Sequence, residues 1–159
     1  MIRKIIKVLL VAVILFVGGY QSSSSNENNQ EEVNEINESV SIVQSIKFEF
    51  DDKEIIVKLE DNSATQDLIS RLPMAMQFED YNNTEKIYYL DKELDLSDIN
   101  PGCTPLRGTL AYYVPWGNLC FFYHNFDYSD DLVPLGKVSE GLEYLEQLDT
   151  VTQVQVSLV

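Results

Sequence analysis

The sequence predicts a mainly β domain, built as a barrel or a sandwich, behind an N-terminal signal and a polar linker. From residue 46 onward, short segments that alternate apolar and polar residues follow one another closely, as in all-β barrels and sandwiches. The chain has 159 residues, which is enough for one domain with its own core. The sequence has no apolar run of the roughly 20 residues that a transmembrane helix needs.

The charge balance excludes one class of partner. The chain has 11 Lys and Arg against 26 Asp and Glu, a net charge of −15. Binding of nucleic acid requires a clustered basic surface to meet the phosphates, so we expect no nucleic-acid partner. One His and two Cys leave few ligands for a transition metal, and we expect neither a metal nor another cofactor.

Residues 1–19 have the pattern of a secretory signal peptide. Three cations lie in residues 1–7, and residues 8–19 (VLLVAVILFVGG) carry no charge, as in the basic and apolar segments of such a signal. Val17 and Gly19 are small enough for cleavage before Tyr20. An uncleaved signal-anchor is the alternative. We therefore expect the protein to be secreted or to lie on the outer face of the cytoplasmic membrane, with membrane contact only through this segment.

Residues 20–45 are predicted to form a disordered polar and acidic linker. They are mostly Ser, Asn, Gln and Glu with isolated aliphatics, and such a segment cannot bury enough apolar area to offset chain entropy. A short amphipathic helix over residues 31–43 stays open, because aliphatic residues recur there at helical spacing. Tyr20 stands where a bacterial lipoprotein would need a cysteine, so a lipid anchor is not supported.

The domain itself is predicted to span residues 46–159, with about eight short strands and two short helices. Asp51, Asp52 and Lys53 suit a hairpin turn, and Asn62 and Ser63 suit the start of a helix that Pro73 ends. The predicted strands are residues 46–50, 54–59, 74–81, 87–90, 110–114, 119–123, 135–138 and 150–158, and the predicted helices are residues 64–72 and 140–148, the second capped by Ser139. A long irregular connection is expected over residues 91–107.

The strand over residues 119–123 predicts two different faces. Side chains alternate across a strand, so Cys120 and Phe122 share one face and Leu119, Phe121 and Tyr123 share the other. We expect one face to pack in the core and the other to face a cleft. Residues 115–118, which join this strand to the preceding one, are predicted to form a hairpin turn. Trp116 there is either a plug for the turn or, with Tyr112 and Tyr113, the mouth of a pocket.

Two stretches resemble cyclophilins. Residues 96–110 (LSDINPGCTPLRGTL) are similar to the cyclophilin run FHRxxPGFxxQGGDF, and residues 118–123 followed by LGKV and SEGLEYLEQ are similar to SQFFI followed by FGKVxEG. The pattern is closest to a bacterial, often secreted, group of cyclophilin-like domains. The resemblance covers residues 46–159 and implies a closed eight-stranded cyclophilin-like β-barrel with two short capping helices.

Cyclophilins are prolyl isomerases, and the resemblance allows that chemistry to be checked residue by residue. Such an enzyme directs an Arg at the prolyl nitrogen, places a Gln on the carbonyl and seats the proline on a Phe. In the resemblance the Arg position holds Asp98 and the Gln position holds Leu106. An aromatic position of the pocket holds Cys103, and Phe122 matches the Phe on which the proline sits. An ionised Asp has no hydrogen to donate, and losing one oriented donor costs about 2.7–4 kcal/mol of transition-state stabilisation.

We therefore predict a non-catalytic module that binds a small molecule or a peptide and exists as a monomer. The expected ligand-binding residues are Phe122, Cys120, Cys103, Leu106 and Tyr113. The alternative is an envelope peptidyl-prolyl isomerase or chaperone, in which Arg107 would replace the missing cation. A structural or accessory domain without a ligand is the third interpretation.

Cys103 and Cys120 are the two cysteines of the chain. Export exposes them to oxidising conditions, where an even number of cysteines favours a disulfide. The resemblance places both on the same cleft. A disulfide and two free buried thiols both stay open, and a metal or redox site is the weakest of the three interpretations.

Overall fold

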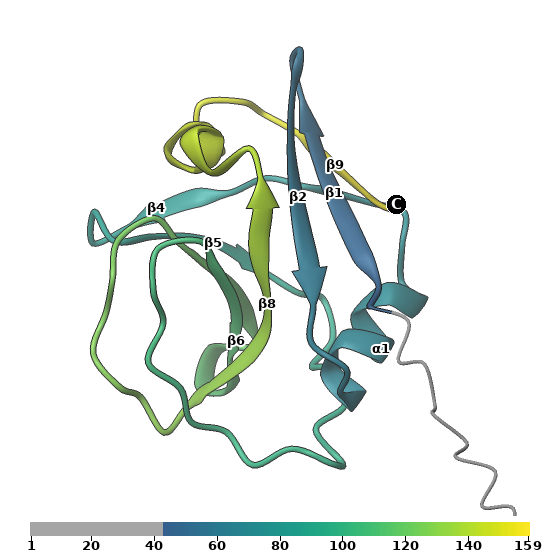
Figure 1. The fold of residues 1–159 in the computed structure, drawn as a ribbon, viewed down its shortest axis with the longest axis vertical. Coiled ribbons are helices and arrows are strands. Elements are labelled where there is room, and N and C mark those ends of the chain that lie inside the picture. Colours follow the sequence, from purple (N-terminus) through teal and green to yellow (C-terminus); the bar gives the residue numbers. More distant parts are fainter. Residues whose placement is uncertain (1–42) are drawn as a thin grey trace, which may run out of the picture. The chain divides into compact units, whose positions relative to one another are not determined.

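The computed structural model describes residues 43–159 (Figure 1). The predicted signal over residues 1–19 and nearly all of the predicted linker lie outside these residues. Within residues 43–159, no helix has the length and apolar character needed to span a membrane. The elements are β1 (Ser45–Phe50), β2 (Lys53–Leu59), α1 (Ser63–Ser70), β3 (Met74–Met76), β4 (Glu79–Tyr81), β5 (Glu85–Tyr89), β6 (Thr109–Tyr113), the 3₁₀ helix η1 (Val114–Trp116), β7 (Asn118–Phe122), β8 (Leu132–Glu140), the 3₁₀ helix η2 (Leu142–Gln147) and β9 (Val154–Leu158).

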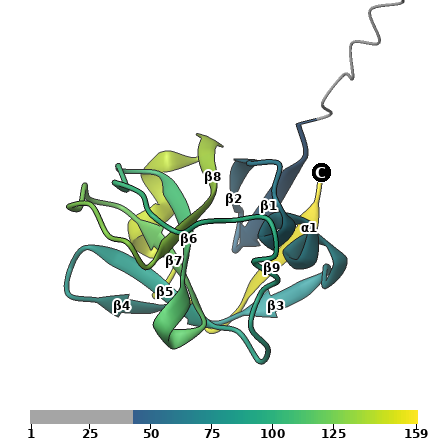
Figure 2. The same ribbon diagram turned by 90° about the horizontal axis from the view of Figure 1, so that it is seen from below.

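The strands form one antiparallel, strongly curled sheet, as Figure 2 shows from below. The sheet has nine strands in the order β3-β9-β1-β2-β8-β6-β7-β5-β4. The predicted mainly β class is therefore confirmed. The predicted closed eight-stranded barrel is wrong, because in the described part of the chain the edge strands β3 and β4 do not pair with each other.

The difference arises where the sequence predicts a single strand over residues 74–81. Met74–Met76 pairs with β9, whereas Glu79–Tyr81 pairs with β5 at the opposite edge of the sheet. Gln77 and Phe78 carry the chain between the two edges, and the Phe78 ring is buried 6.1 Å from the ring of Phe48. The two edges are thus joined by the covalent chain and a core aromatic side chain instead of a ladder of hydrogen bonds.

Helix α1 begins where the sequence predicts it. The Asn62 Oδ1 accepts a hydrogen bond from the Thr65 N–H at 2.9 Å, and Thr65 Oγ1 accepts one from the Asn62 N–H at 3.2 Å. This reciprocal pair satisfies two donors that a helix start would otherwise leave free. The helix ends at Ser70, two residues before the predicted end.

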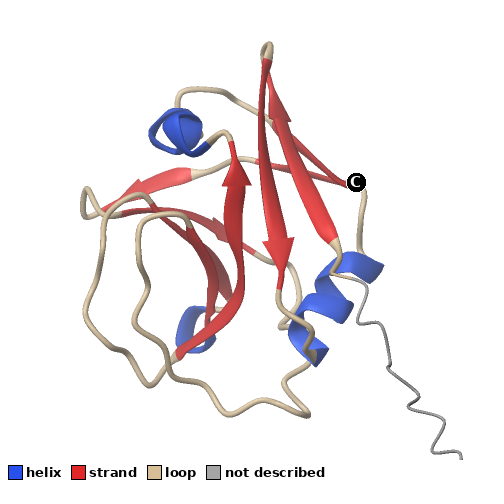
Figure 3. Ribbon diagram, in the orientation of Figure 1, coloured by secondary structure: helices blue, strands red, loops and turns tan. Residues whose placement is uncertain are grey.

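The second predicted helix forms as a shorter 3₁₀ helix, η2 (Figure 3). Ser139 does not cap it, because Ser139 belongs to the long strand β8. Gly141 precedes η2 instead, with φ +76°, and a Cβ at this residue would meet the carbonyl oxygen of Glu54. Only glycine combines this backbone conformation with so close an approach of strand β2.

The two faces of β7 differ as the alternation predicts. Leu119, Phe121 and Tyr123 belong to the main hydrophobic core inside the curled sheet. Cys120 and Phe122 belong to a second, smaller cluster, which also contains Ile87, Ala111 and Leu132. We call the side of the sheet that carries the second cluster the pocket face, and the opposite side the core face.

A buried lysine on the core face links the edge strand β4 to the C-terminal part of the chain. Lys86 is 4 % exposed, and its Nζ lies 2.8 Å from a carboxylate oxygen of Asp80 and 2.8 Å from one of Asp149. The Tyr123 hydroxyl donates to Asp80 at 2.6 Å, and Lys86 Nζ lies 4.9 Å from the centre of the Tyr123 ring. Burial acts to lower the pKa of Lys86, but the hydrogen bonds to Asp149 and Asp80 raise it overall.

Candidate functional site

The pocket face carries a cavity of about 230 Å³ that opens to the surface. Its base comes from alternate residues of two neighbouring strands, Glu85 on β5 and Asn118, Cys120 and Phe122 on β7. Leu132, at the start of β8, adds a further wall. Alternation along the strands therefore explains how residues far apart in sequence line one cavity.

The later part of the long loop over residues 90–108 pairs with the loop over residues 123–131 beside the cavity; Figure 1 shows the two loops as ribbons. Backbone hydrogen bonds join them. Cys103 and Ser129 exchange a pair at 3.1 and 3.0 Å, and the Phe126 N–H donates to the Pro105 carbonyl at 2.9 Å. Because Phe126 and Ser129 both line the cavity, the paired loops hold one of its walls in place.

Three aromatic side chains form the mouth of the cavity. The Trp116 ring lies 5.4 Å from the rings of both Tyr81 and Tyr113, edge-on to each at 86°. The Pro115–Gly117 turn presents Trp116, with Gly117 in the left-handed conformation at φ +65°. Trp116 belongs to the predicted hairpin connection and lines the cavity together with Tyr113, so the pocket-mouth interpretation is confirmed for these two residues.

Tyr112 is not part of this mouth. Its ring lies in the core, and its hydroxyl accepts a hydrogen bond from the Leu94 N–H at 3.4 Å.

The base of the cavity is polar and incompletely hydrogen-bonded. Asn118 is 1 % exposed, and its Nδ2 donates to the Leu119 carbonyl and to Cys120 Sγ, each at 3.3 Å. Within residues 43–159, neither Asn118 Oδ1 nor Glu85 Oε2 has a hydrogen-bond partner, although both atoms are buried. Such groups are rare in folded proteins, because an unpaired buried acceptor costs about 1–3 kcal/mol.

Glu85 and Cys120 influence each other at this base. Burial raises the pKa of Glu85, while the neighbouring Cys120 thiol acts to lower it. Burial also raises the pKa of the Cys120 thiol, and the Glu85 carboxylate raises it further. The thiol therefore stays protonated at neutral pH and is not an activated nucleophile.

Comparison with known proteins now identifies the family. The model of the cyclophilin-like family matches residues 48–159. The chain belongs to the cyclophilin-like family. The comparison with curated proteins gave no match. The resemblance predicted from residues 46–159 is therefore confirmed, whereas the bacterial, secreted group within the family stays a prediction.

The cyclophilin-like domain brings together three of its five predicted binding residues. Phe122, Cys120 and Tyr113 line the cavity. Cys103 is half-buried and packs against the cluster that contains Cys120 and Phe122, but it does not line the cavity. Leu106 is exposed on the 90–108 loop and lies outside the lining.

Sequence reasoning missed the polar residues of the cavity. Glu85 and Asn118 lie on strands whose neighbouring residues are mostly apolar. Alternation places Glu85 on the same face as Ile87, and Asn118 on the same face as Cys120. That shared face was the signal from which both cavity residues could have been predicted. Tyr81 was missed because residues 74–81 read as one strand. Among the described residues, no cluster of three or more His, Cys, Asp or Glu is arranged to hold a metal.

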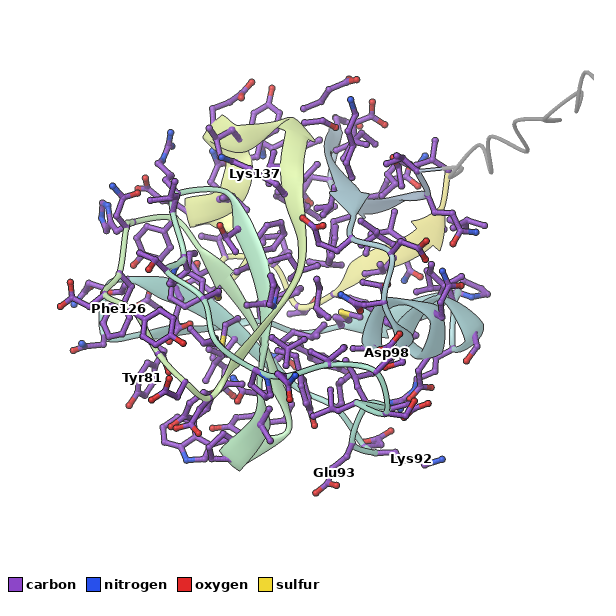
Figure 4. All side chains as sticks on the ribbon, turned by 60° about the horizontal axis from the view of Figure 1, so that its bottom comes forward. Tyr81, Lys92, Glu93, Asp98, Phe126 and Lys137 are labelled. Carbon is purple, nitrogen blue, oxygen red and sulfur yellow. The ribbon has the colours of Figure 1, made fainter. Side chains whose placement is uncertain are left out.

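Asp98 does not lie at the cavity of the cyclophilin-like domain. Its Oδ1 accepts a hydrogen bond from the Ser63 N–H at 3.0 Å, at the start of α1, and hydrogen bonds with Ser63 hold the pKa of Asp98 below its ordinary value. Figure 4 shows Asp98 beside α1, well apart from Tyr81 and Phe126. Arg107 is exposed and is also absent from the lining, and its backbone N–H donates to Asn125 Oδ1 at 2.8 Å.

Both cysteines are free in the structure. Burial raises the pKa of the Cys103 thiol as it does that of Cys120. A disulfide between Cys103 and Cys120 stays a prediction. Thiol titration of the unfolded chain distinguishes it from two free thiols.

Proposed function

We propose that this cyclophilin-like domain binds a small molecule or a peptide side chain in the cavity on its pocket face. The observation that carries the proposal is the pair of buried acceptors at the base, Asn118 Oδ1 and Glu85 Oε2, which lack protein partners within the described chain. Glu85 and Asn118 both line a cavity that opens to the surface, and the two buried atoms lie in its base. A bound ligand would supply their missing hydrogen bonds, and the surrounding aromatic rings offer apolar contact.

A binding role fits the lining better than prolyl isomerisation does. Isomerisation needs a donor aimed at the prolyl nitrogen when the amide twists out of resonance. Of the described residues that line the cavity, none is Lys, Arg or His. Asn118, which has amide donors, already uses its Nδ2 on Leu119 and Cys120.

A protease-coupled assay with a proline peptide tests the catalytic alternative. We expect no rate above buffer. A clear rate that Arg107→Ala abolishes would show that the exposed arginine reaches the substrate. The proposed binding function would then be wrong, and the protein would be a prolyl isomerase.

Binding is tested with the fluorescence of Trp116, the single tryptophan of the chain, and with ¹H–¹⁵N NMR spectra during a screen of small fragments and short peptides. Ligands should shift signals of Glu85, Asn118 and the Trp116 indole. Phe126→Ala should weaken binding, because Phe126 lines the cavity. Leu158→Ala is the matched control, since both side chains are 48 % exposed and Leu158 lies on β9, outside the lining. If no compound shifts these signals, the proposed function is wrong.

We further propose that the domain works outside the cytoplasmic membrane, released or held by an uncleaved N-terminal segment. The basic and apolar segments of residues 1–19 support this. N-terminal sequencing of the full-length protein, expressed in a bacterial host, should find Tyr20 as the first residue of the exported form. Recovery of the intact chain from the cytoplasm alone would contradict export.

A further inference from the structure

The cavity offers hydrogen-bond acceptors to a ligand and carries a single acidic group. Glu85 is the one carboxyl group among the described lining residues, and no Lys, Arg or His of the described chain lies within ion-pair distance of it. The other unpaired atom, Asn118 Oδ1, is also an acceptor. A ligand that forms hydrogen bonds with both of these acceptors must carry N–H or O–H donors.

The aromatic mouth favours a cation among such donors. The plane of the Trp116 ring is nearly perpendicular to the ring planes of both Tyr81 and Tyr113. A positive charge is attracted to the face of an aromatic ring, most strongly to that of tryptophan. The three rings line the same cavity as the Glu85 carboxylate, and aromatic faces near a carboxylate are a combination that favours an ammonium group.

The charge of the chain points the same way. With 26 Asp and Glu against 11 Lys and Arg, the surface attracts cations and repels anions at a distance. The lysine closest in sequence to Glu85 is Lys86, which lies on the core face and is already bound to Asp80 and Asp149. It cannot neutralise Glu85 without breaking that buried cluster.

We propose that the ligand of this site is a primary or secondary ammonium ion with an apolar substituent, such as an alkylamine, an aralkylamine or a lysine side chain. Its N–H groups bind Glu85 Oε2 and Asn118 Oδ1, its charge lies against the Trp116 and Tyr81 rings, and its apolar part lies against Phe122 and Leu132. This inference rests on the proposed function, because it names the chemistry of the molecule that the same cavity binds.

The competing occupant is a neutral or anionic carbonyl compound. Burial raises the pKa of Glu85, and a protonated Glu85 would donate to a carbonyl oxygen instead of accepting from an ammonium group. Four probes separate these chemistries, because they share one apolar part: benzylammonium, benzyltrimethylammonium, benzyl alcohol and benzoate.

The experiment titrates each probe into ¹⁵N-labelled protein at neutral pH and follows the signals of the cavity residues. Benzylammonium should bind most tightly. Benzyltrimethylammonium, which has no N–H, should bind more weakly, and benzoate should not bind. Tighter binding of benzyl alcohol or benzoate than of benzylammonium would overturn the inference and leave the proposed function standing. Absence of any shift in the cavity with all probes and in the wider screen would overturn both.

Glu85→Gln tests the role of the charge. It should weaken the binding of benzylammonium by at least about tenfold, because one charge-assisted hydrogen bond and the attraction between opposite charges are lost. The binding of benzyl alcohol should weaken less, because the alcohol carries no charge. Glu79→Gln is the matched control, because Glu79 is an exposed acid of the adjacent strand β4 outside the lining, and it should change the affinity less than about twofold.

Trp116→Leu provides a second variant on an exposed side chain. It should lower the affinity for benzylammonium about two- to fivefold, because the cation loses its contact with the indole ring. Equal affinities of the wild type, Glu85→Gln and Trp116→Leu for benzylammonium would contradict the inference.

Discussion

Glu85 and Lys86 are neighbours on strand β5, and they point to opposite faces of the same sheet. Lys86 is enclosed on the core face by Asp80, Asp149 and the ring of Tyr123. Glu85 lies on the pocket face with one carboxylate oxygen buried and unpartnered in the described chain. Lys86 is buried and Glu85 is half-buried. The protein pairs the charge of Lys86 on both sides, but it leaves one carboxylate oxygen of Glu85 without a partner in the described chain.

The contrast separates stability from binding within one strand. A buried charge that the fold pairs fully holds the surrounding elements together, and removing one partner is strongly destabilising. A buried polar group that the fold leaves unpaired weakens the free protein and becomes useful only when a ligand pairs it. The core face of β5 therefore stabilises the domain, and the pocket face retains the capacity to bind.

The largest difference between the faces should appear at two adjacent phenylalanines of β7. Phe121 is 0 % exposed in the main core and Phe122 is 2 % exposed beside the cavity. Phe121→Ala should lower the free energy of unfolding by about 3–5 kcal/mol. Phe122→Ala should lower it by less, because its ring already borders an open cavity. Urea denaturation measures both, and equal losses would remove the distinction between the two faces.

The second prediction concerns the buried lysine. Lys86→Met should lower the free energy of unfolding by about 3 kcal/mol, because it leaves Asp80 and Asp149 without their partner. Lys58→Met, at an exposed lysine of β2, serves as the control and should change stability by less than about 0.5 kcal/mol. A Lys86→Met domain as stable as the control would show that the cluster contributes nothing.

The third prediction concerns one hydrogen bond in the cluster around Lys86. Tyr123→Phe deletes the hydroxyl that donates to Asp80 at 2.6 Å and keeps the ring beside Lys86. The free energy of unfolding should fall by about 1.5–3 kcal/mol, the usual contribution of a hydrogen bond to a charged group. An unchanged urea midpoint would place the strength of the cluster in its ion pairs alone.

The smallest predicted effect is a gain in stability, and it concerns Glu85. Because burial raises the pKa of Glu85, the folded state binds its proton more tightly than the unfolded state does. This group therefore removes stability as pH rises from the ordinary carboxyl range through the raised pKa. Glu85→Gln should match the wild type at low pH and become slightly more stable than it near neutral pH, in thermal melts without ligand.

Glu79→Gln should follow the wild-type pH profile instead. A Glu85→Gln variant that loses stability at neutral pH would indicate that the carboxylate is paired after all. Comparing the difference between variants isolates Glu85, since Asp67, Asp80 and Asp98, whose pKa values are lowered, contribute equally to both.

The sequence predicted which side chains share a face of a strand better than it predicted which strands pair with each other. The alternation around Cys120 and Phe122 separated core from pocket correctly, because side-chain parity is local to one strand. The strand over residues 74–81 was predicted as continuous because Met74, Met76 and Phe78 keep the same alternation, although the hydrogen-bonding partner changes at Gln77. Pairing depends on the curl of the whole sheet, which alternation does not encode.

The candidate site was predictable only in part for the same reason. Phe122, Cys120 and Tyr113 belong to a hairpin that the sequence identifies, and they line the cavity. Glu85 reaches it through pairing of β5 with β7, a contact between strands that are far apart in the sequence. Leu106 and Asp98 lie on the long loop before β6, where a linear comparison with a catalytic relative cannot place side chains in space.

The most direct test of this account is the titration of benzylammonium into the wild-type domain and into Glu85→Gln, followed by ¹H–¹⁵N NMR at neutral pH. The account predicts saturable shifts at Asn118, Cys120 and the Trp116 indole in the wild type, and at least about tenfold weaker binding in the variant. Shifts at other surfaces only, or equal affinity in both proteins, would contradict it.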